Sequence, residues 1–111
     1  MYHHNINVNN LKNDLIKYFE NLSQVKFDLF ESIVNQNNSI TCRQLEKLPL
    51  QSTNSKYKLS YEANYKIYGK MIFDVFRRPN KFSHTFKNGS SINTSVGQLN
   101  YFRWLFESEL L

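Results

Sequence analysis

The residues best suited to chemistry lie in one stretch of the chain, residues 56–87, where aromatic side chains are interleaved with cations. This stretch carries eight cations and two acids, a net charge of +6, whereas the remaining residues carry six cations and seven acids, a net charge of −1. Nucleic-acid bases stack on aromatic faces, while Lys and Arg neutralise phosphates. The pattern predicts a polyanion-binding surface. Its cations are Lys56, Lys58, Lys66, Lys70, Arg77, Arg78 and Lys81.

Arg77, Arg78 and Lys81 surround Pro79-Asn80, a pair typical of turns. A turn would project these cations together, which suits contact with phosphates. The structural alternative is a solvated loop whose charges protect a sheet edge from pairing. For the tyrosines of the segment, burial in the core with the lysines facing water is the competing interpretation.

Other reactive side chains are few and separated. His3 and His4 are adjacent but have no third ligand at metal-binding spacing, and His84 lies within an apolar alternation. Cys42 has no histidine that the sequence places beside it, and nothing fixes the distance between Glu62 and Asp74. We therefore expect no enzyme activity, no cofactor and no metal site.

The 111 residues are enough for a single domain with one modest core. One cysteine permits no internal disulfide, which favours a reducing compartment. The chain starts without the pattern of a signal peptide and contains no apolar run long enough for a transmembrane helix, so we expect no membrane association and an intracellular location. Abundant asparagine and scarce alanine suggest an AT-rich genome, such as that of a virus or mobile element.

The N-terminal part predicts a loosely held arm over residues 1–9 and then a helix of roughly 24 residues capped by Asn9 or Asn10. A break near residues 21–23 is the alternative. Thr41 and Gln44 form a capping box that predicts a short second helix ending before Pro49. The apolar stripe of the long helix is Leu11, Leu15, Tyr18, Leu22, Val25, Leu29 and Ile33.

Residues 56–67 alternate strictly between apolar and polar side chains, the period of a half-buried strand. As a helix, this segment would place tyrosines on one side and Leu59, Ala63 and Ile67 on the other, with no clean polar face. The pattern therefore favours a strand. The alternative is a recognition helix in a winged helix-turn-helix, with Lys58, Glu62, Lys66 and Arg77–Arg78 facing a groove.

Further strands are predicted over residues 71–77, 82–87 and 90–94, with hairpin turns near residues 68–70, 78–81 and 88–89. Asn88-Gly89 is a strong signal for a type I′ hairpin turn. Ser95 and Gln98 form a second capping box, which opens a C-terminal helix. The fold expected is α+β: a long N-terminal helix, a short second helix, a three- to four-stranded antiparallel sheet, and a C-terminal helix packed on that sheet.

Two functions fit this picture. The first is a non-enzymatic nucleic-acid-binding module that uses the basic, aromatic sheet. The second is a protein-interaction subunit, an inhibitor or assembly component, that meets an acidic partner surface or forms a homo-oligomer. Its interface would lie on the long N-terminal helix and the C-terminal helix, because the latter is apolar nearly all round. The C-terminal residues assigned to it are Tyr101, Trp104, Leu105 and Leu111.

Overall fold

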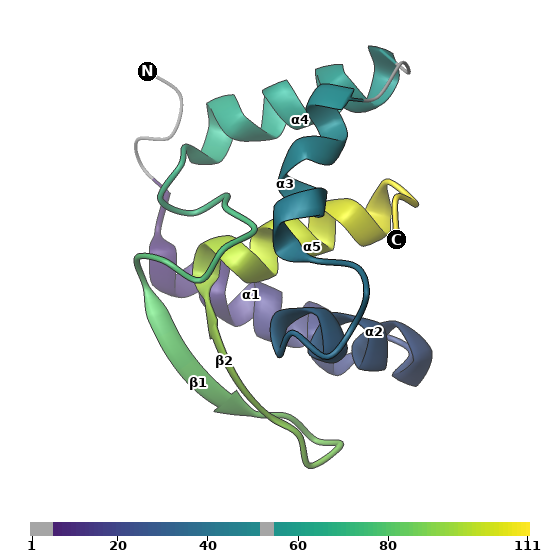
Figure 1. Cartoon of the computed structure of the whole chain (residues 1–111). Helices are drawn as coiled ribbons and strands as arrows, with labels where there is room; N and C mark the ends of the chain where they lie inside the picture. The colour runs from purple at the N-terminus through teal and green to yellow at the C-terminus, as the bar shows by residue number, and fades with distance from the viewer. Residues whose placement is uncertain (1–5, 52–54) are drawn as a thin grey trace.

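A computed structural model describes residues 6–51 and 55–111. Over these residues it contains five helices and one two-stranded antiparallel sheet, with the last helix following the strands (Figure 1). The mixed class of the fold is as predicted, but the strands are fewer. The elements are α1 (Val8–Glu20), α2 (Gln24–Val34), α3 (Cys42–Gln51), α4 (Ser55–Tyr68), β1 (Lys81–Thr85), β2 (Ser91–Ser95) and α5 (Val96–Glu107).

The single long N-terminal helix is wrong, because the chain breaks into α1 and α2 at residues 21–23. Asn21 ends α1 by donating its side-chain amide to the carbonyl of Lys17 at 2.8 Å. Ser23 then caps α2 by accepting from the N–H of Lys26 at 3.3 Å. Asn7, rather than Asn9 or Asn10, caps α1, so residues 8 and 9 of the predicted arm belong to a helix. Two local caps thus outweigh a continuous apolar stripe.

Helix α3 begins with the predicted capping box. Thr41 accepts from the N–H of Gln44 at 3.2 Å, and Gln44 accepts from the N–H of Thr41 at 2.9 Å. The predicted end before Pro49 is wrong, because Pro49 lies inside the helix. A proline there cannot donate to the carbonyl four residues earlier, that of Leu45. The buried hydroxyl of Tyr101 donates to that carbonyl instead, at 2.9 Å.

The strand predicted over residues 56–67 is also wrong, since this segment is the helix α4. A strict alternation of apolar and polar residues can also occur in a helix when apolar side chains lie on two opposite sides of it, as they do in α4. Tyr61 and Tyr68 pack against the core, whereas Leu59 and Ile67 are exposed. The alternative of a helix was therefore correct for this segment.

The segment 69–80 is a loop without strands, so the predicted strand over residues 71–77 and the hairpin turns near residues 68–70 and 78–81 are wrong. Its backbone pairs with α5 instead of a neighbouring strand. Asn100 donates to the carbonyl of Ile72 at 2.8 Å, Gln98 donates to the carbonyl of Val75 at 2.9 Å, and the N–H of Asp74 donates to the carbonyl of Gly97 at 3.2 Å. Side-chain amides thus satisfy the polar groups that a sheet would have satisfied.

The hairpin at residues 81–95 is confirmed in place, with His84 opposite Ile92. Its turn differs from type I′, because Gly89 has a positive φ (91°) and Asn88 does not. Lys12 lies over the ring of Phe82, 4.3 Å from its centroid, which places β1 against α1. The described strands therefore form a single hairpin beside the helices, and Ile92 of β2 reaches the same core as α5.

Helix α5 occupies the centre of the molecule (Figure 1). Ser95 caps it as predicted, by accepting from the N–H of Gln98 at 3.0 Å, but the Gln98 side chain bonds Thr94 and Val75 and does not complete the box. Ten of its twelve residues are buried. Phe102 and Phe106 meet aromatic rings of α1 and α2, while Tyr101 and Trp104 meet those of α4 and the following loop. The helices thus enclose α5 from two sides.

Candidate interaction surface

Helix α4 is held by its inner side. Trp104 of α5 donates its indole N–H to the hydroxyl of Ser60 at 2.9 Å. The ring of Tyr61 lies 5.7 Å from that of Trp104 and 6.3 Å from that of Tyr101. Burial raises the pKa of Tyr61, with Tyr65 adding to the effect, so the phenol stays neutral. These contacts fix the rotation of α4 and hence the residues that it presents outward.

The outer side of α4 carries an apolar stripe. Leu59, Ala63 and Ile67 recur every four residues and so lie on one side of the helix. Leu59 is 65% exposed and Ile67 is 47% exposed. Tyr65, 41% exposed, lies farther round the helix toward Tyr61. We call Leu59, Ala63 and Ile67 the outer stripe of α4.

Three lysines of the predicted phosphate surface are on α4, where all are exposed, but they do not share one side. Lys66 borders the outer stripe beside Leu59, whereas Lys58 lies farther round the helix, with Glu62 between the two lysines. Lys56 lies three residues before Leu59 and therefore on the side of the outer stripe, nearly opposite Lys58. Lys70, in the turn that follows, is exposed as well.

The remaining three predicted cations lie beyond α4. Arg77 donates to the carbonyl of Asn93 in β2 at 3.0 Å. Arg78 pairs with the buried carboxylate of Asp74 at 3.2 Å and more distantly with Glu46 at 3.9 Å. Lys81 is exposed at the start of β1. The seven cations are thus spread over a helix, a loop and a hairpin, and the basic aromatic sheet is not formed.

The winged helix-turn-helix arrangement is met only in part. Helices α3 and α4 follow one another and lie across each other, but the tip of the β1–β2 hairpin lies at the other end of the molecule from α4 (Figure 1). A wing beside a recognition helix is therefore absent from the described residues.

The predicted partner interface on α5 is internal. Tyr101, Trp104 and Leu105 are at most 5% exposed, because α1, α4 and the loop after α4 cover them. Leu111 is half-buried against the same core. Their apolar character serves the fold, and exposed apolar side chains occur instead on α4.

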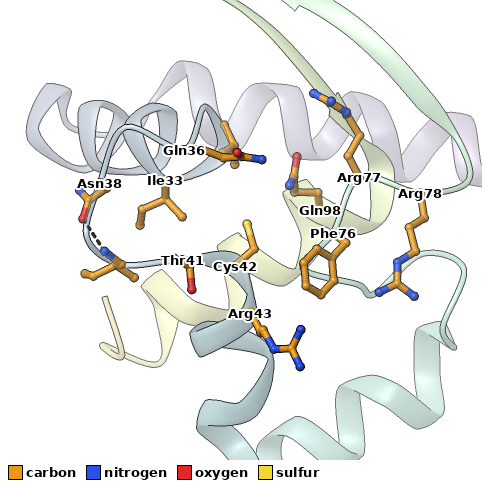
Figure 2. Close-up of a pocket in the computed structure, with 12 residues that line it drawn as sticks. Ile33, Gln36, Asn38, Thr41, Cys42, Arg43, Phe76, Arg77, Arg78 and Gln98 are labelled. Atoms are coloured by element: carbon orange, nitrogen blue, oxygen red, sulfur yellow. Dashed lines mark hydrogen bonds between the residues drawn. The ribbon is translucent and has the colours of Figure 1, made fainter.

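A second feature is a cleft of about 520 Å³ between the end of α2, the start of α3 and the loop before β1. Figure 2 shows Gln36 and Asn38 on one side, Arg77 and Arg78 on the other, and Cys42 and Arg43 between them. Sequence reasoning missed Arg43, because it lies far from the basic segment along the chain. Its place in the first turn after the Thr41 cap was the available signal.

The cleft is lined by one thiol, that of Cys42. Burial, with Asp74 adding to it, raises the pKa of the Cys42 thiol, which disfavours the nucleophilic thiolate. His84 contacts Glu20 at 3.4 Å on the hairpin side. Within residues 6–51 and 55–111 no three His, Cys, Asp or Glu side chains gather as a metal site requires. His3 and His4 lie outside the described residues.

These features define a small, mainly helical domain with one β-hairpin, an exposed apolar helix face and a basic cleft. The chain belongs to a family of unknown function, DUF7197, whose model matches residues 4–111. No curated protein and no solved structure gives a significant match. Among the helices described, none has both the length and the apolar composition required to cross a lipid bilayer.

Proposed function

We propose that this protein is a non-enzymatic interaction subunit whose α4 binds an acidic, amphipathic segment of a partner protein. The outer stripe of α4 carries the proposal. Tyr61 and its neighbours anchor the opposite side of the helix. The exposed side chains of Leu59 and Ile67 therefore do not contribute to holding α4 against the core. Apolar residues at helical spacing are the usual anchors when two helices associate.

Charge selects the partner. Lys66 borders the stripe, and α4 as a whole has three lysines against Glu62 alone. A second copy of the chain would bring two basic faces together, which is repulsive. An amphipathic helix with acidic residues beside its apolar side is complementary in both respects.

A synthetic helical peptide with leucine at heptad core positions and glutamate beside them is a suitable probe. Fluorescence anisotropy should show saturable binding to the full chain, and the same peptide with lysine in place of glutamate should not bind. Combined Leu59→Ser and Ile67→Ser substitutions should weaken the affinity by about 10- to 100-fold, because interface anchors each contribute about 1 kcal/mol or more.

Val25→Ser is the matched control, since Val25 is an apolar residue 80% exposed on α2. It should leave peptide binding unchanged. Equal losses in the control and the double variant, or binding of the lysine peptide as well as the glutamate peptide, would refute an acidic partner at α4.

Nucleic-acid binding is the second candidate, favoured by the concentration of positive charge in residues 56–87. Here Lys58, Lys66 and Lys70 would contact phosphates from one end of the molecule. Affinity for a DNA or RNA duplex should then fall steeply with salt, and each lysine replaced by glutamine should reduce the logarithmic salt slope by about 0.7–0.9. A mobility shift at low salt that is insensitive to Lys58→Gln with Lys66→Gln would exclude this surface.

A further inference from the structure

The cleft beside α3 is chemically distinct from the outer stripe of α4. Three arginines line it, and none of its lining residues in the described chain is acidic. Its volume of about 520 Å³ lies within the range of pockets that hold small organic ligands. The walls also contain the apolar side chains Ile33, Ile40 and Phe76.

The three guanidinium groups differ in how far they are already engaged. Arg78 is largely neutralised by Asp74 and lies over the ring of Phe76, 4.9 Å from its centroid. Arg77 donates through one terminal nitrogen to Asn93 and retains other donors. The side chain of Arg43 is exposed, and its guanidinium has no hydrogen bond or ion pair to another described residue. The cleft therefore has positive charge that the protein does not itself neutralise.

The start of α3 adds to this charge. The Thr41 side chain accepts only from the N–H of Gln44. The N–H groups of Cys42 and Arg43 lie in the first turn, where a helix offers them no carbonyl acceptor. No acidic side chain lies in the first turn of α3. The positive end of the helix dipole and the arginines thus act in the same place.

We infer that this cleft binds a small phosphorylated organic molecule, such as a nucleoside diphosphate. Its phosphates would contact Arg43 and the free donors of Arg77, and its organic part would lie against Phe76 and the two isoleucines. A guanidinium matches phosphate oxygens with paired donors. The three arginines line a single cleft rather than a track across the surface, which suits a compact anion better than a nucleic-acid strand.

The test is isothermal titration of the full chain with ADP, pyrophosphate and inorganic phosphate, each to about 5 mM, a range that detects millimolar affinity. ADP should bind saturably and more tightly than pyrophosphate, because only ADP has an organic part for the apolar walls. Arg43→Gln should weaken ADP binding by about 10-fold or more, the value of one charge-assisted hydrogen bond.

Lys47→Gln is the matched control, since it removes the same charge from α3 at an exposed position that does not line the cleft. It should change ADP affinity less than twofold, roughly 0.4 kcal/mol. Absence of saturable ADP binding, equal effects of the two substitutions, or equal affinity for ADP and pyrophosphate would each overturn the inference. None of these results depends on α4, so the outcome is independent of the proposed partner-binding face.

Discussion

Replacing Tyr101 by Phe removes one hydroxyl and leaves the carbonyl of Leu45 without a donor. Pro49 has no N–H to offer that carbonyl, and the hydrogen bond from Tyr101 at 2.9 Å is buried. An unsatisfied buried carbonyl costs about 1–3 kcal/mol. With an unfolding entropy of about 2.1 cal/mol/K per residue, a 111-residue chain loses roughly 4 °C in Tm per kcal/mol. Tyr101→Phe should therefore lower Tm by about 4–13 °C.

If Tyr101 replaces the donor that Pro49 lacks, the effects of Tyr101→Phe and Pro49→Ala on stability should be coupled, whereas a simple loss of packing would leave them independent. In a Pro49→Ala background, residue 49 regains an N–H and can donate to Leu45 as in an ordinary helix. Tyr101→Phe should then cost at least about 1 kcal/mol less, measured by urea unfolding with the fluorescence of the single tryptophan as signal. Tyr18→Phe, at a half-buried phenol with no hydrogen bond in the described residues, is the control. Equal costs of Tyr101→Phe with and without Pro49 would refute the reasoning.

Three further outcomes follow from the packing. The hydrogen bond from the backbone N–H of Lys87 and, to a smaller extent, that from His84 hold the pKa of Glu20 below its ordinary value. The free energy of unfolding should therefore fall as the pH drops below about 4.3. Glu20→Gln should make this fall less steep in urea titrations. Burial raises the pKa of Tyr101 far above its ordinary value, so stability should decline above about pH 10, and absorbance at alkaline pH should show Tyr101 ionising only with unfolding. A methyl group on Gly97 would lie 3.3 Å from backbone atoms of Met71, Phe73 and Asp74. Gly97→Ala should therefore lower the unfolding free energy by about 1 kcal/mol, although alanine favours helices. A higher Tm for this variant would contradict the close contact.

The sequence predicted the elements that local chemistry defines. The Thr41 capping box and the Ser95 cap mark the starts of α3 and α5, and Asn88-Gly89 marks the hairpin turn. These signals need only neighbouring residues. They place a hairpin directly before a helix, which is the part of the predicted α+β fold that the structure contains.

The errors arose where distant contacts decide the structure. Residues 71–77 contain an apolar run that resembles a strand, yet Asn100 and Gln98 of α5 bind its carbonyls. The extent of α3 past Pro49 depends on Tyr101, far along the chain. The basic cleft likewise joins Arg43 to Arg77 through folding, so no spacing in the sequence could reveal it.

The alternation that wrongly predicted a strand at α4 is also the feature that supports its proposed function. A helix needed only for the core has one apolar side, whereas α4 has an inner side with Tyr61 and an outer side with Leu59 and Ile67. Serine at Leu59 and Ile67 together should therefore change the unfolding free energy by less than about 1 kcal/mol, while Tyr61→Ala should cost roughly 2–3 kcal/mol through its lost aromatic contacts. If the serine variant proved as unstable as Tyr61→Ala, the outer stripe would belong to the fold and would not be a surface kept for a partner.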